Sequence, residues 1–198
     1  MKYASRLKLT PITFYTQQKI THNRNSGILK GDRPCHTVVN LVSDEQRESV
    51  LSVLPKELAD KLFYLTLITV KSTLPHIHIN DGDTVINWYL ETNQEVLTFY
   101  DGEIRDVTSE WVEDVDNAYF IPDPTLLRPV ASFTAKENEI WMLDATKPHS
   151  VSLYPNETDI EKKYLSVDGT HRLMLHACFN CDYEYARNIM KKNIVEEI

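Results

Sequence analysis

The residues best suited to chemistry in this chain lie in one alternating run, Leu-Pro-His-Ile-His-Ile-Asn-Asp, at positions 74–81. In a β-strand, successive side chains point to opposite faces, so His76, His78 and Asn80 share one face and the two isoleucines share the other. Imidazole nitrogens bind divalent transition metals, and an amide oxygen is a weaker, neutral ligand. A barrel with a functional lumen has a use for such a polar row. The run therefore predicts a metal or ligand site inside a β-barrel.

Two polar positions further along the chain extend this prediction. His149 lies in Lys-Pro-His-Ser-Val, where a turn leads into a strand. In the later strand at 171–179, alternation places Arg172, Met174, His176 and Cys178 on one face and leucine, alanine and phenylalanine on the other. We expect the face that carries Arg172 to lie at the mouth of the lumen, near the metal.

The order of these motifs resembles a known family. A His-x-Asn pair ends one strand, Asn-x-Tyr-Leu lies in the next, Thr-Phe-Tyr closes a hairpin, and Pro-His-Ser-Val and a strand arginine follow. This series, over residues 74–180, resembles the small iron(II)/2-oxoglutarate-dependent oxygenases of the double-stranded β-helix fold, especially the compact versions found in phages. The resemblance implies a hydroxylase that uses Fe(II) and 2-oxoglutarate as cofactors.

Carried over by position, the resemblance makes His78 and His149 iron ligands and places Asn80 where the family has an aspartate. The departure matters, because a neutral amide oxygen lowers the affinity for iron. Asp81 is adjacent, but alternation points it to the opposite face unless a bulge re-aims it.

The resemblance also implies a cosubstrate pocket. Arg172 is expected to hold the distal carboxylate of 2-oxoglutarate, because its guanidinium can form two parallel hydrogen bonds with a carboxylate. Asn87, Tyr89 and Tyr100 are candidates for hydrogen bonds within the same pocket.

Two other interpretations remain open. His76-x-His78-x4-Asp83, followed by His149, resembles the cupin metal motif with Asp in place of Glu, and implies a metal site without 2-oxoglutarate. The other is a non-catalytic barrel that binds a ligand or a protein, with Asn80 marking a lost metal ligand.

The remaining histidines are expected to be structural, and the two cysteines of the Cys-x-x-Cys pair are expected to be reduced thiols. These residues are His22, His36, His171, His176, Cys178 and Cys181.

Hydrophobic periodicity predicts a mainly β fold, a double-stranded β-helix of the jelly-roll or cupin-like type, with flanking helices at both ends. We expect a single domain over 1–198, with a barrel core at about 63–180 and helical buttresses at about 43–62 and 182–197. Ser43 and Gln46 form a capping-box pattern at the start of the first helix. The acidic stretch 101–128 is expected to be an insertion or lid beside which substrate enters.

The composition narrows the class of protein further. The 198 residues suffice for one core, and a net charge of −8, from 29 acidic and 21 basic residues, disfavours a nucleic-acid surface. No apolar stretch approaches the length of a membrane span, and no signal-type apolar block follows the first residues. We expect a cytoplasmic enzyme, in the host cytoplasm if it is phage-encoded, that acts on a small molecule or protein, and we leave a homodimer open.

Overall fold

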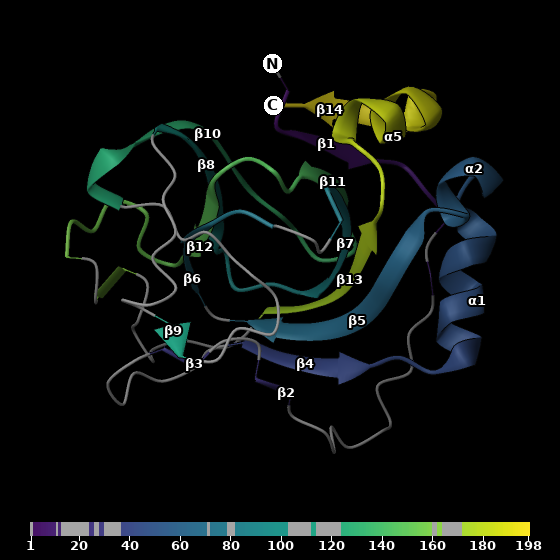
Figure 1. Ribbon diagram of the computed structural model, residues 1–198, viewed down its shortest axis with the longest axis horizontal. Helices are drawn as coiled ribbons and strands as arrows, with labels where there is room; N and C mark the ends of the chain where they lie inside the picture. Colours follow the sequence, from purple (N-terminus) through teal and green to yellow (C-terminus); the bar gives the residue numbers. More distant parts are fainter. Residues whose placement is uncertain are drawn as a thin grey trace.

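The molecule consists mainly of two facing antiparallel sheets (Figure 1). The computed structural model describes residues 2–10, 12, 24–25, 28–29, 37–70, 72–78, 82–102, 112–113, 124–159, 162–163 and 172–198. The larger sheet has eight strands in the order β14-β1-β11-β7-β13-β5-β4-β2, and the smaller has four in the order β10-β8-β12-β6. The larger-sheet strands are Ile194–Glu197, Ala4–Leu7, Ile140–Asp144, Thr84–Glu91, Arg172–Phe179, Leu62–Val70, Thr37–Leu41 and Arg24–Asn25; the smaller-sheet strands are Leu127–Thr134, Val96–Gly102, His149–Ser152 and Thr73–His76.

The strand order is that of a double-stranded β-helix. From β5 to β8 and from β10 to β13 successive strands alternate between the two sheets, and β8 and β10 are neighbours in the smaller sheet. The segments β11-β7-β13-β5 and β10-β8-β12-β6 therefore form the two halves of the jelly roll. The predicted fold class is confirmed. A separate two-stranded pair joins β3 (Ile28–Leu29) to β9 (Val112–Glu113), and a short 3-10 helix (Pro124–Leu126) precedes β10.

The predicted first helix begins where its cap was expected. In α1 (Asp44–Val53), the Ser43 hydroxyl accepts a hydrogen bond from the Gln46 amide, and the Gln46 side chain accepts one from the Ser43 amide. A second helix, α2 (Lys56–Ala59), follows Pro55 and is shorter than expected because β5 begins at Leu62.

The C-terminal segment differs from its prediction. Helix α5 (Tyr183–Met190), capped by Asp182, covers only part of the expected helical buttress, and the last residues form β14. Strand β14 pairs with β1 at the edge of the larger sheet, next to the start of the chain. The Tyr183 hydroxyl lies 2.7 Å from the Ser5 hydroxyl, which ties α5 to β1.

Two apolar clusters lie on opposite faces of the larger sheet. The outer cluster joins strand residues such as Leu175 and Phe179 to Val50 of α1, Leu58 of α2 and Met190 of α5. The inner cluster lies between the two sheets and fills one part of the lumen. On the larger sheet its residues alternate along each strand with those of the outer cluster. Its members include Val85, Tyr89, Trp141, Leu143, Met174 and Cys178 on the larger sheet and Leu97, Phe99 and Val151 on the smaller. The helices therefore pack on the outer face of the larger sheet, and strand residues line the lumen.

Gly82 lies two residues before β7. Its φ of +91° is in the left-handed region, and a Cβ at this position would lie 2.8 Å from the Phe179 carbonyl oxygen. Glycine is required here for both reasons, so the backbone that leads into β7 has a local cause in the sequence.

Candidate metal centre

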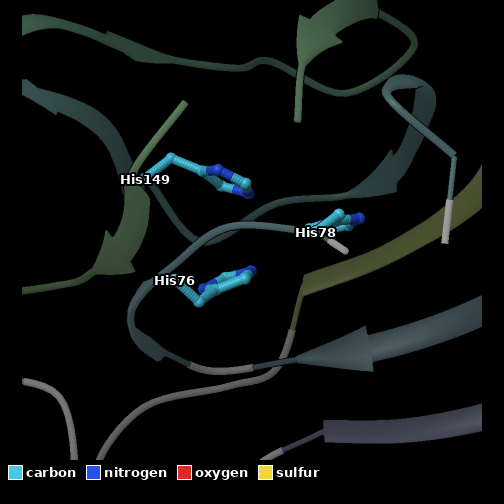
Figure 2. A group of neighbouring side chains, drawn as sticks. All are labelled: His76, His78 and His149. Atoms are coloured by element: carbon cyan, nitrogen blue, oxygen red, sulfur yellow. The ribbon is translucent and has the colours of Figure 1, made fainter. Parts of the chain in front are cut away.

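Three histidines converge in the lumen (Figure 2). His76 ends β6 and is the cross-strand partner of His149, the first residue of β12. His78 follows β6, where its backbone amide donates to the Ala145 carbonyl at 2.9 Å. The ligand nitrogens of the three residues all lie within 4.8 Å of one another, and their ring centroids are 4.4 to 5.4 Å apart. We call this group the histidine triad.

The environment of the triad favours the neutral, ligating form of imidazole. His78 and His149 are buried, and burial lowers the pKa of each well below its usual value. Neighbouring histidines lower both values further, because a second positive charge nearby is unfavourable. At neutral pH both rings therefore have a lone pair for a metal.

A backbone contact sets the tautomer of His149. Its Nδ1 lies 2.8 Å from the Lys147 carbonyl oxygen, which can only accept, so Nδ1 carries the proton and donates it. The lone pair is then on Nε2. A metal-binding histidine usually donates its other ring N–H to a carbonyl or carboxylate in this way, so the residues fit a divalent transition metal.

Of the three predicted oxygen ligands, Asn80, Asp81 and Asp83, the described residues include Asp83. Among the described residues, no Asp or Glu joins the three histidines. Asp83, the carboxylate of the cupin-type alternative, has an exposed side chain, and only its backbone carbonyl bonds to the Ala145 amide. Asn80 and Asp81 lie outside the described residues.

A second group of ligand atoms adjoins the triad and shares one residue with it. The atoms of His78, His176 and Cys178 also lie within 4.8 Å of one another, and all three side chains are buried. His176 bonds through Nδ1 to the Asn87 side-chain oxygen at 2.7 Å and through Nε2 to the Cys178 sulfur at 3.2 Å. Burial, followed by the charges of Arg172 and His76, lowers the pKa of His176 to about 3.

Arg172 lies in the lumen as a buried cation. Its side chain is 5% exposed, and its guanidinium carbon lies 5.7 Å from the centroid of the buried Tyr89 ring. Its Nε has no hydrogen-bond partner, and no carboxylate among the described residues forms an ion pair with it. The positive charge contributes to the lowered pKa values of His149 and His176, so the guanidinium and the histidines share one electrostatic environment.

The three predicted pocket residues have different positions. Asn87 and Tyr89 are buried on the lumen face of β7, where Asn87 holds His176, and burial raises the pKa of Tyr89. Tyr100 is a correction, because it lies on the opposite face of β8, with its hydroxyl 2.8 Å from that of Ser150. Strand alternation explains the difference, since its neighbour Phe99 faces the lumen and contacts His149.

Sequence reasoning placed His176 and Cys178 on the correct face but gave them no role. The signal was their alternation with Arg172 on β13. The missing information was the pairing of His176 with Asn87 on the neighbouring strand, which alternation within one strand does not provide.

Comparison with models of protein families finds no match, and comparison with curated proteins finds none. Among solved structures, the chain is similar to vicilin from Corylus avellana (hazelnut), with 9% identity and a TM-score of 0.35 over 73% of this chain and 30% of that one. It is also similar to E. coli ycfD, with 12% identity and a TM-score of 0.41 over 94% of this chain and 44% of that one. The chain thus spans less than half of each of these proteins. Among the described residues, no helix is long and apolar enough to cross a membrane.

Proposed function

We propose that this protein is an iron(II)- and 2-oxoglutarate-dependent oxygenase. In this proposal His76, His78 and His149 hold the iron, and Arg172 binds the distal carboxylate of 2-oxoglutarate. Iron supplies the ability to activate dioxygen for oxidation of a substrate. The observation that carries the proposal is the buried guanidinium of Arg172, which shares the lumen with the triad and has no carboxylate partner among the described residues.

A buried guanidinium needs an anion. Moving a charge out of water is strongly unfavourable unless a partner of opposite charge and good hydrogen-bond geometry offsets it. Arg172 has the Tyr89 ring on one side, and this contact does not neutralise its charge. A ligand carboxylate meets the need, and the planar guanidinium can bind it in a bidentate manner.

The charge of the triad points to a dianion. Three neutral imidazoles leave both positive charges of a divalent ion uncompensated, and Arg172 adds a third. A dicarboxylate with one end at the metal and the other at Arg172 offsets two of these charges. 2-Oxoglutarate has this charge, and its α-keto acid end is a chelating group.

The ligand set itself supports a second candidate, a cupin-type metalloprotein that does not use 2-oxoglutarate. The described residues offer three histidines and no carboxylate, in the order His76-x-His78 and then His149, which is the histidine pattern of the cupin alternative. In that case Arg172 would hold an anionic substrate directly. A non-catalytic, ligand-binding barrel is the remaining outcome.

Anaerobic titration separates these functions. Iron(II) followed by 2-oxoglutarate should produce a weak visible charge-transfer band in the wild type. Arg172→Ala should weaken 2-oxoglutarate binding by about 1.5 to 3 kcal/mol, roughly 10- to 150-fold, and leave iron affinity nearly unchanged. Arg128→Ala is the matched control, because Arg128 is exposed on β10 and pairs with Asp101.

Each other outcome has a definite meaning. Iron binding without the band favours the cupin-type function. Equal 2-oxoglutarate affinity in the wild type and Arg172→Ala rejects the cosubstrate role of Arg172. Absence of iron binding leaves the non-catalytic barrel.

A further inference from the structure

We propose that the lumen contains a second metal site, formed by His78, His176 and Cys178, which takes a thiophilic divalent ion of the zinc type. Because His78 belongs to both this site and the triad, the two sites are filled one at a time. The inference goes beyond the oxygenase proposal and does not depend on 2-oxoglutarate.

The geometry of the three atoms carries the proposal. In a tetrahedral site with bonds of about 2.0 Å to nitrogen and about 2.3 Å to sulfur, ligand atoms lie about 3.3 to 3.6 Å apart. The Cys178 sulfur and His176 Nε2 are already 3.2 Å apart, and the ligand atom of His78 lies within 4.8 Å of both. A small movement of His78 toward this pair completes a three-ligand set.

Asn87 prepares His176 for this role. Its side-chain oxygen, 2.7 Å from Nδ1 of His176, fixes the ring proton on Nδ1 and leaves the lone pair of Nε2 facing the sulfur. Such an outer hydrogen bond is the usual support of a metal-binding histidine.

The ligand types distinguish this site from the triad. Thiolate with two imidazoles favours zinc and other thiophilic ions, whereas three imidazoles accept a wider range of first-row metals. On binding, the contact between Cys178 and His176 is replaced by two metal bonds, and the thiol releases its proton to solvent. The order Asn87, His176, Cys178 also resembles the groups that activate a nucleophilic cysteine, but Cys178 has 0% exposure, and burial of this kind favours a small ion over a bulky substrate at its sulfur.

Sharing of His78 makes the sites mutually exclusive. A neutral imidazole has one lone pair, so it binds one ion at a time. Zinc in the second site therefore removes one of the three triad ligands, and the apparent iron affinity should fall progressively as the zinc concentration is raised.

Cobalt(II) is the spectroscopic probe, because a cobalt–thiolate bond gives a near-ultraviolet charge-transfer band that nitrogen ligands do not give. Under anaerobic, reducing conditions the wild type should show this band at one cobalt per chain. Cys178→Ser should lose it, and the control Cys181→Ser should keep it, since Cys181 packs against the outer cluster instead. A missing band in the wild type, or a band that persists in Cys178→Ser, overturns the proposal.

A second measurement avoids any variant that fails to fold. Zinc X-ray absorption of the wild type at one zinc per chain should show a single sulfur at about 2.3 Å. A shell of nitrogen and oxygen alone overturns the proposal.

The triad and the second site can fail separately. His76→Ala removes a triad ligand at a half-buried position and leaves all three atoms of the second site. It should abolish the iron and 2-oxoglutarate band and retain the cobalt–thiolate band. A wild type with the iron band and no thiolate band rejects the second site alone, and the reverse pattern rejects the proposed function alone.

Discussion

The two faces of strand β13 are both buried but carry side chains of different chemistry. On the outer face, Leu175 and Phe179 are fully buried beneath the helices. The lumen face carries Arg172, His176 and Cys178, which alternate with the outer residues. These side chains are also buried, but they are polar or can bind a metal. The outer face buries apolar side chains that stabilise the fold, and the lumen face carries the groups that could bind a metal or an anion. A single strand thus serves both purposes because its side chains alternate.

The lumen face reduces stability in the absence of a ligand. Buried imidazoles and a buried guanidinium lose hydration, and the hydrogen bonds among them offset only part of that loss. The outer face, with apolar contacts from three helices, supplies the compensating free energy. The comparison therefore predicts that the faces respond differently to pH, substitution and metal.

Acid should produce the largest difference. The pKa values of His78, His149 and His176 are lowered in the folded state, so between pH 6.5 and about 3 the unfolded chain binds more protons than the folded one. Stability is fully present above pH 6.5 and falls with pH below it. His176, with a pKa of about 3, contributes about 2 kcal/mol between pH 6.5 and 5, and the lowered pKa values of His78 and His149 add to the loss in the same direction. Urea unfolding of metal-free protein at pH 7 and 5 should show a loss of at least about 2 kcal/mol.

The control for this prediction is His176→Gln, which lacks the ring whose pKa is about 3 and should lose about 2 kcal/mol less stability over the same pH interval. Equal stability of the wild type at pH 7 and 5 would contradict the assignment of neutral, buried imidazoles to the lumen.

A substitution on the outer face should have the next largest effect. Phe179→Ala leaves a cavity among fully buried residues and should lower the free energy of unfolding by about 3 to 5 kcal/mol. Iron affinity measured well below the unfolding midpoint should stay within about twofold of the wild type, because no triad atom changes. A parallel loss of metal affinity would show that the two faces are not separable.

Local patterns predicted most of the fold. The alternation at 171–179 predicts β13 to within one residue, and the capping box at Ser43 predicts the start of α1. Strand β14 could not be predicted in this way, because its partner β1 lies at the other end of the chain. The helical pattern that starts at Asp182 gives no sign that the chain leaves the helix after Met190 to reach that partner.

The candidate site depends on information that crosses strands. The sequence offered two metal sets, one with His78 and Asn80 and one with His76 and His78. The pairing of His76 with His149 brings the histidines of the second set together without Asp83, and that pairing follows from the register of β6 against β12, which lie far apart in sequence. Tyr100, which was named from the family resemblance, lies on the outer face of β8 because it alternates with the lumen-facing Phe99.

The smallest predicted effect tests whether the outer face can be weakened alone. Ser43→Ala removes the side-chain acceptor for the Gln46 amide at the start of α1, and should lower the free energy of unfolding by about 1 kcal/mol. Ser52→Ala is the matched control, because this exposed serine in α1 bonds only to the Ser49 carbonyl and alanine favours the helix. Combined with Phe179→Ala, the Ser43 change should be additive to within about 0.5 kcal/mol, since the two sites share no partner. Thermal and urea unfolding give these values, and iron titration of Ser43→Ala should match the wild type. A change in iron affinity in that variant would mean that the helices influence the lumen through the sheet.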